Sequence, residues 1–172
     1  MIFNILLIIT LVICCITDLR VRKIYNKIIF PILFSVFVLQ IILNGFSGLK
    51  VSLLGFALGI AILIIPFILG GLGAGDVKLL ALIGALKGGL FAINTALYMC
   101  IIGGAIALII ILFHKETINF IKSLFYFLVG LISGHRYKLV FSTTPFIQKF
   151  PYSIAIAGGA LISLLSKGAI II

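Results

Sequence analysis

Long apolar runs separated by short polar segments dominate the chain. Five runs contain no Lys, Arg, Asp or Glu: residues 2–17, 28–49, 51–75, 88–114 and 150–166. A helix needs about 20 apolar residues to cross the ~30 Å hydrocarbon core of a bilayer, where backbone polar groups must be paired within the protein. The pattern predicts an all-α, polytopic helical membrane protein with about six transmembrane helices. The predicted spans are 2–17, 28–44, 51–70, 77–93, 95–113 and 151–170.

The composition supports this class, since 64% of the residues are hydrophobic and only 9% are charged. A soluble domain of 172 residues with this composition would have too little polar surface. The first run has no basic start and ends in Asp18 and Arg20 instead of a small-residue cleavage site. We therefore interpret it as a retained span and not as a signal peptide. No linker or internal repeat divides the chain, and we expect one domain over residues 1–172.

The basic residues indicate how the chain is oriented in the membrane. A net charge of +10 would point to nucleic acid in a soluble protein, but here we interpret it as topological and expect no nucleic-acid partner. With the N-terminus outside, the loops 18–27, 70–78 and 114–150 are cytoplasmic and hold all but three of the 13 Lys and Arg residues. The positive-inside rule thus predicts a multi-pass protein of the inner or plasma membrane, with Asp18 and Asp76 both on the cytoplasmic side.

Two segments affect the count of spans. Lys87 follows Lys78 by nine residues, about 14 Å along a helix, so the fourth span is short or Lys87 extends outward. Residues 118–134 are apolar enough to cross but contain Lys122, and we interpret them as an interfacial or re-entrant helix. If they cross, the protein has seven spans.

Two pairs of glycines have the four-residue spacing that is typical of close helix contacts. Gly55 and Gly59 lie in the third predicted span, and Gly84 and Gly88 lie in the fourth. Small residues at this spacing allow two backbones to approach closely. We expect these glycines to pack helices within the chain and not to form a dimer.

The two aspartates are the main candidates for chemistry. Asp18 ends the first predicted span, Asp76 opens the fourth, and the only other acid is Glu116. An ionisable group costs roughly 2.5–3.5 kcal/mol at the centre of a bilayer and less towards the interface, which favours a functional role for the pair. Two carboxylates that share a proton can act as general base on a water and as general acid on a carbonyl. Such a pair hydrolyses peptide bonds without a metal.

Each acid also has a structural interpretation, in which Asp18 pairs with Arg20 or Arg22 and Asp76 caps a helix N-terminus. If the pair is catalytic, the helix dipole favours the anion at Asp76, at a helix N-terminus, and disfavours it at Asp18, at a helix C-terminus. We therefore expect Asp18 to hold the resting proton. Lys78 would point about 200° round the helix from Asp76, and we expect it to contact lipid phosphate or to hold the loop.

No metal or organic cofactor is expected. Cys14, Cys15 and Cys100 all lie inside apolar runs, without the spacing of a metal site or the polar setting that activates a thiol. His114 and His135 lie in the basic loop and are interpreted as interfacial. The sequence offers neither a metal cluster nor a Ser/His/Asp set.

Three stretches resemble one known family, the type IV prepilin peptidases. GLGAGDVKLLALIGALKG resembles their GxGDxKL signature, and DLRVRKIYNKI resembles the segment around their first catalytic aspartate. FPYSIAIAGGAL resembles the ending of the short members that serve Flp-type, tight-adherence pili. The resemblance implies an intramembrane aspartic endopeptidase with Asp18 and Asp76 as its catalytic pair. It would remove the short basic leader of a prepilin after a glycine, at the cytoplasmic face.

The resemblance also covers supporting residues and includes two departures. Four residues match the motifs outside the acids: Gly73, Gly75, Lys78 and Asn26. Tyr25 stands where the family usually has proline, which leaves the shape of the loop after Asp18 open. Ser153 stands where glycine is common, and we expect that change to be minor. The loop 18–27 has no room for the cysteine-containing insert of the bifunctional members, so we predict no methyltransferase activity.

Other functions stay open at this point. Archaeal preflagellin peptidases use the same pair of acids on a different filament subunit. A small proton-coupled transporter or channel subunit would use the acids as a relay and would not need them to meet. A structural subunit would have no chemistry. The expected partners are a prepilin, with its basic leader and apolar helix, and the bilayer, whereas the particular prepilin and any homo-oligomer stay open.

Overall fold

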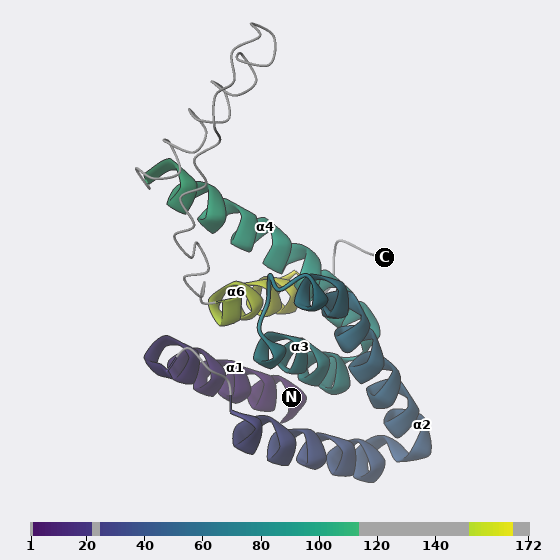
Figure 1. The fold of residues 1–172 in the computed structure, drawn as a ribbon. Helices are drawn as coiled ribbons and strands as arrows, with labels where there is room; N and C mark the ends of the chain where they lie inside the picture. The colour runs from purple at the N-terminus through teal and green to yellow at the C-terminus, as the bar shows by residue number, and fades with distance from the viewer. Residues whose placement is uncertain (1, 22–24, 114–151, 167–172) are drawn as a thin grey trace, which may run out of the picture. The chain divides into compact units, whose positions relative to one another are not determined.

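The computed structural model describes residues 2–21, 25–113 and 152–166. This part of the chain forms five α-helices and no strand (Figure 1). The helices are α1 (Ile2–Val21), α2 (Asn26–Ile68), α3 (Ala74–Lys87), α4 (Gly89–Phe113) and α6 (Tyr152–Leu165). The predicted all-α class is confirmed for these residues, whereas the segment 118–134 lies outside them.

The chain divides into two compact units. The first contains residues 1–102 and 151–172, and therefore holds α1, α2, α3, α6 and the first half of α4. The second contains residues 103–150, of which 103–113 are described and form the rest of α4. Leu108 and Ile109 are exposed there. One domain over residues 1–172 stays a prediction.

Three of the described helices are long and apolar enough to cross a membrane: α1, α2, and α4 over residues 89–109. Large apolar side chains are exposed along them, as at Phe34 and Phe46, which is typical of a surface that faces lipid. α3 and α6 have 14 residues each, about 21 Å, which is shorter than the hydrocarbon core. The protein is therefore a multi-pass membrane protein, and three candidate spans are found in the described residues where the sequence predicted about six.

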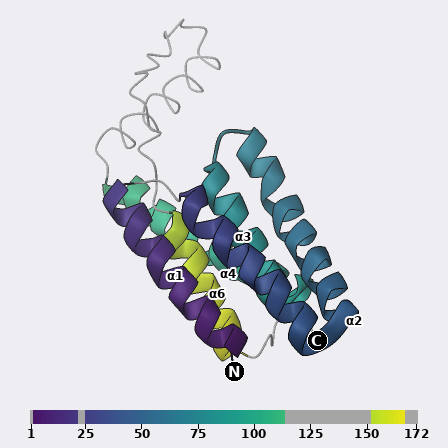
Figure 2. The same cartoon turned by 90° about the horizontal axis from the view of Figure 1, so that it is seen from below.

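α2 turns back on itself at Gly45. It is helical on both sides of Gly45, whose φ of 62° and ψ of −155° are not helical, and Figures 1 and 2 show its two halves running in opposite directions. An uninterrupted helix of 43 residues would be about 64 Å long, twice the hydrocarbon core. The sequence predicted spans 28–44 and 51–70 with a loop between them. The turn instead takes a single residue, because glycine tolerates a positive φ.

The second half of α2 packs closely on α3 through the predicted glycines. A Cβ on Gly55 would lie 2.0 Å from the Gly84 oxygen, and a Cβ on Gly59 would lie 2.6 Å from the Ala81 Cα. The Ser52 hydroxyl also donates a buried 2.7 Å hydrogen bond to the carbonyl of Ala85, across the two helices. The predicted close contact is confirmed at these positions. Between residues 76 and 86 of α3 every side chain except Lys78 is buried, so α3 is the central helix of its unit.

α3 ends earlier than predicted. Its last residue is Lys87, and Gly88, with a φ of 89°, separates it from α4, which begins at Gly89. The predicted boundary between the fourth and fifth spans, near residue 94, is therefore wrong. A Cβ on Gly88 would make only an ordinary contact, 3.6 Å from Val51, so this glycine serves the turn and not the packing. Lys87 therefore lies at the end of a short helix and not in the middle of a longer one.

Candidate active site

The contact between α1 and α3 brings the two aspartates to the same end of the bundle. Lys87, in the last turn of α3, donates a hydrogen bond to Asn4, in the first turn of α1. The two helices therefore run in opposite directions, and the last turn of α1 adjoins the first turn of α3. Those turns carry Asp18 and Asp76, and the charge of Asp18 acts on the carboxyl of Asp76.

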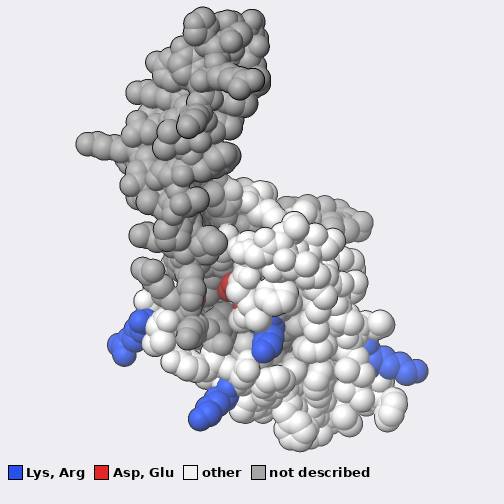
Figure 3. All heavy atoms as spheres, in the orientation of Figure 1, with Lys and Arg blue, Asp and Glu red and all other residues white. Residues whose placement is uncertain are grey.

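Both acids are removed from the surface. Asp18 is 9% exposed and Asp76 is 8% exposed. Figure 3 shows a small area of acidic atoms in red beside white atoms, whereas the blue Lys and Arg side chains project outward. α1 continues through Asp18 to Val21, four residues beyond the predicted span, so Asp18 lies inside the helix and not in the loop. A buried carboxylate needs polar partners, and each of these acids has one.

Asp76 is held by the backbone just before its own helix. Gly73 is the N-cap residue of α3, and its N–H donates a 3.1 Å hydrogen bond to Oδ2 of Asp76. The N–H of Asp76 in turn donates to the Gly73 carbonyl at 3.1 Å. A Cβ on residue 73 would lie 3.2 Å from Oδ2, so glycine leaves room for the carboxyl to approach. The predicted capping role of Asp76 is therefore observed, and Gly75 lies within the first turn of the capped helix.

Asp76 precedes the apolar part of α3, outside the three candidate spans. Burial raises its pKa from the ordinary 3.8 to about 6, the hydrogen bond from Gly73 lowers the pKa, and the charge of Asp18 raises it. Burial thus outweighs the helix N-terminus, on which the expectation of a resting proton on Asp18 depended. The raised pKa instead favours Asp76 as an acid that takes up a proton as the pH falls towards 6.

Asp18 has its partner on α6. The Ser153 hydroxyl donates a buried 2.5 Å hydrogen bond to Oδ2 of Asp18. The thiol of Cys15, one helical turn before Asp18, donates to the Ser153 carbonyl at 3.6 Å. Arg20, which was considered as an ion-pair partner for Asp18, is exposed, and Arg22 lies outside the described residues.

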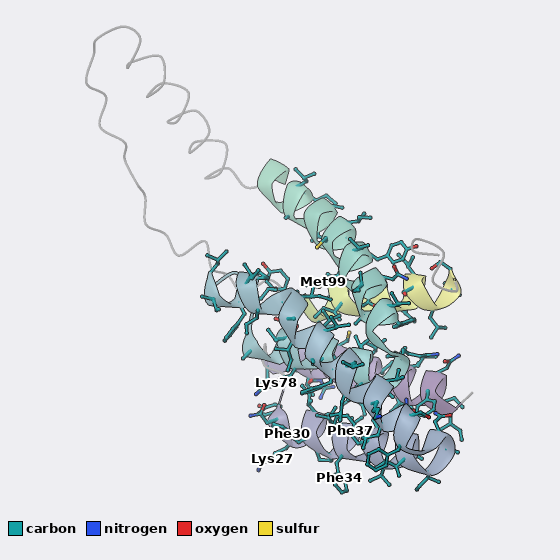
Figure 4. The ribbon with its side chains drawn as sticks, turned by 90° about the vertical axis from the view of Figure 1, so that its right-hand side faces the viewer. Lys27, Phe30, Phe34, Phe37, Lys78 and Met99 are labelled. Carbon is teal, nitrogen blue, oxygen red and sulfur yellow. The ribbon has the colours of Figure 1, made fainter. Side chains whose placement is uncertain are left out.

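Lys78 and Asn26 contact each other beside the aspartates. The Lys78 ammonium donates a 2.8 Å hydrogen bond to Oδ1 of Asn26, and it lies 5.8 Å from the centroid of the Phe30 ring. Figure 4 shows Lys78 next to Phe30. Lys78 therefore ties the first turn of α3 to the first turn of α2. The expectation that Lys78 contacts lipid phosphate or holds the loop stays a prediction.

The chain matches the Type IV leader peptidase family (peptidase A24) over residues 5–108. It belongs to this family. The matched range is more than half of the chain and contains both aspartates and the four supporting motif residues, but it ends before Ser153. No curated protein and no solved structure matches the chain.

Membership makes this protein an aspartic prepilin leader peptidase of the membrane. The geometry of the site suits that chemistry, because two buried carboxyls from different helices lie within electrostatic reach of each other. One of them, Asp76, has a pKa of about 6, so the pair can take up a single proton as the pH falls towards that value. Such a pair can polarise a water and protonate a carbonyl oxygen.

Two departures from the family motifs have different outcomes in this peptidase. Tyr25 has φ −80° and ψ 133°, an extended conformation that proline also adopts, so the missing proline leaves the backbone at this residue unchanged. Ser153 was expected to be a minor change, and the structure adds that its hydroxyl bonds to Asp18, a contact that glycine could not make. A hydroxyl inside a charge-free apolar run, aligned with a motif glycine, was the signal that could have identified it.

Possible metal ligands do not gather in the described part of the peptidase. No three His, Cys, Asp or Glu side chains there lie close enough to hold a metal ion. Cys14, Cys15 and Cys100 are free thiols. His114, His135 and Glu116 lie outside the described residues. Catalysis without a cofactor stays a prediction.

Proposed function

We propose that Asp18 and Asp76 are the catalytic dyad with which this peptidase removes the leader of a prepilin. The observation that carries the proposal is their placement: the chain has two aspartates, and both are buried at the adjoining ends of α1 and α3. A proton relay or a structural subunit would not require them to interact. Their interaction is what a shared proton needs.

The mechanism divides acid and base work between the two carboxyls. In the reactive protonation state Asp76, with its raised pKa, carries the proton and Asp18 is the base. Asp18 takes a proton from a water, whose oxygen attacks the carbonyl carbon of the scissile peptide, while Asp76 gives its proton to the carbonyl oxygen. The tetrahedral intermediate then collapses, the C–N bond breaks, and the leaving amine receives the proton held by Asp18. The carboxyls return to their starting state when Asp76 regains its proton from the intermediate.

The supporting residues hold the acids in place. Gly73 fixes the carboxyl of Asp76 through its N–H, and Gly75 gives the substrate backbone close access to it. Lys78 and Asn26 fix the start of α2 against the start of α3. None of these side chains needs to take part in proton transfer.

The proposed substrate is a prepilin with a short basic leader, a glycine and an apolar helix, cut after the glycine at the cytoplasmic face. The motif FPYSIAIAGGAL, near residue 155, favours a Flp-type prepilin. We place the N-terminus outside and both acids on the cytoplasmic side, because most basic residues then lie inside. The turn at Gly45 supports six membrane-crossing segments, since it divides α2 into two opposed halves beside α1, α3, α4 and α6.

Co-expression with a prepilin tests the proposal. The peptidase and its Asp18→Asn and Asp76→Asn variants are expressed in separate cultures with a Flp-type prepilin, and leader removal is followed by gel shift and N-terminal sequencing. Each replacement should abolish cleavage while the variant accumulates in the membrane at the wild-type level. Normal processing by either variant would reject the dyad. Cleavage of an archaeal preflagellin in preference to the prepilin would reject the substrate and retain the dyad.

A further inference from the structure

Ser153 joins the first turn of α6 to the last turn of α1 at the site itself. Its hydroxyl donates to Oδ2 of Asp18 at 2.5 Å, and its carbonyl accepts from the thiol of Cys15 at 3.6 Å. Cys15 and Asp18 are three residues apart and so lie on the same face of α1. Ser153 is fully buried, so water does not compete for these bonds.

The position of Ser153 is set by a rigid helix. α6 contacts both α1 and α3. Its Gly159 lies so close to α4 that a Cβ would be 2.6 Å from the Thr95 oxygen and 2.8 Å from the Met99 nitrogen. A side chain that is held by helix packing can keep a second side chain within the narrow range that catalysis needs.

A hydrogen bond from a hydroxyl restricts what the carboxyl can do. While Ser153 donates to Oδ2, that oxygen is the less basic of the two, which favours proton transfer at Oδ1 of Asp18. The bond also fixes the rotation of the carboxyl group about its Cβ–Cγ axis. Both effects assign the base role to Asp18 and direct one oxygen to the water.

We infer that Ser153 is a positioning residue of this peptidase, which holds the Asp18 carboxyl so that one defined oxygen acts as the base. The inference rests on the proposed catalytic role of Asp18, and it adds a residue from α6 outside the range that matches the family. In this role Ser153 acts through Asp18, to which its hydroxyl is bonded.

The chain allows a direct spectroscopic test, because it has only two aspartates. Full-length peptidase labelled with ¹³Cγ-aspartate in detergent micelles should give two carboxyl signals, which Asp18→Asn and Asp76→Asn assign. Ser153→Ala should shift the Asp18 signal more than that of Asp76, and Ser153→Thr, which retains the hydroxyl, should restore it. Ser163→Ala is the matched control, since Ser163 is also buried on α6 and its hydroxyl has no hydrogen-bond partner among the described residues. It should leave both signals unchanged.

Kinetics of leader cleavage, with a Flp-type prepilin as the probe, complete the test. Ser153→Ala should lower kcat about tenfold with little change in KM, because a misplaced base affects the reacting state and not substrate binding. Ser153→Thr should recover most of the loss. Suppose that Asp18→Asn abolishes cleavage but Ser153→Ala changes neither the Asp18 signal nor kcat. That result would overturn the inference and leave the proposed function intact. Persistent cleavage by Asp18→Asn would instead overturn the proposed function. The Ser153–Asp18 hydrogen bond would then have no catalytic role, even if Ser153→Ala still shifted the Asp18 signal.

Discussion

Lys78 donates a 2.8 Å hydrogen bond to Asn26, and this bond connects the first turns of α3 and α2 next to the two aspartates. The two residues are far apart in sequence and belong to different motifs. A cation close to a carboxyl pair could have bound one of the acids. The Lys78 ammonium instead bonds to Asn26 and lies 5.8 Å from the centroid of the Phe30 ring.

Breaking the Lys78–Asn26 hydrogen bond should weaken the positioning of the site residues without abolishing cleavage. We expect Lys78→Met and Asn26→Ala each to lower kcat by less than the loss of either aspartate. A double-mutant cycle on unfolding should give a coupling of ~0.5–1 kcal/mol, the range of partly exposed charged pairs. Lys27→Met removes a positive charge from the same turn of α2 and serves as control. Fully additive effects of the two replacements would show that the bond contributes nothing.

The contact between Gly55 and Gly84 predicts a strong response to side-chain size. Gly55→Ala places a Cβ 2.0 Å from a backbone oxygen, so α2 and α3 must separate, which should lower the free energy of unfolding by ~1–3 kcal/mol. Gly55→Leu should lower it further. Gly104→Ala is the control, because nothing lies within 4 Å of its Cβ, and alanine favours the helix. Denaturant unfolding in micelles would contradict the packing if both glycines tolerated alanine equally.

Substitutions of Gly45 should destabilise the protein because of its backbone conformation and not because of the size of the new side chain. Its φ of 62° and ψ of −155° lie in a region used almost only by glycine, so Gly45→Ala should destabilise the protein by ~1–3 kcal/mol. Open space surrounds the position, and Gly45→Leu should therefore cost about as much as Gly45→Ala. The same unfolding measurement checks this, and a much larger effect of leucine would mean that packing, not backbone conformation, selects glycine here.

The sequence predicted those features that a bilayer or a local motif imposes. The apolar runs predicted the position of α1 and the membrane class of the protein, because the hydrocarbon thickness dictates the length of a span. The four-residue spacing of Gly55 and Gly59 predicted their packing against α3, because the period of a helix places both on one face. The count of charges in the loops predicted Asp18 and Asp76 on one side of the membrane, and the structure has them at the same end of the α1–α3 pair.

The features that the sequence did not predict depend on backbone angles or on distant packing. A loop was expected around Gly45 and none before Gly88, since composition does not show where one residue adopts a positive φ. The bond of Ser153 to Asp18 links positions 135 residues apart, and it exists because α6 packs beside α1. The protonation of Asp76 was assigned from the helix dipole alone, and burial has the larger effect.

The raised pKa of Asp76 makes the stability of the peptidase depend on pH. Its folded-state pKa of about 6 lies above the ordinary 3.8, so the folded state binds this proton more tightly than the unfolded state. The stabilising contribution is fully present below about pH 4 and is lost as the pH rises through about 6. Its full size is roughly 3 kcal/mol. We therefore expect the wild-type Tm in micelles to be higher at pH 5 than at pH 7.5.

Asp76→Asn should remove this part of the pH dependence, because the amide stays neutral and no ionised carboxyl is buried at either pH. The variant should also unfold at a higher temperature than the wild type at pH 7.5, although it should not cleave prepilin. Asp18 is the charged group that raises the pKa of Asp76, so Asp18→Asn should reduce the difference between the two pH values without abolishing it. A wild-type Tm that rises from pH 5 to 7.5 would contradict the assignment. The same contradiction would follow if Asp76→Asn kept the full wild-type pH dependence, since the titrating group would then lie elsewhere in the chain.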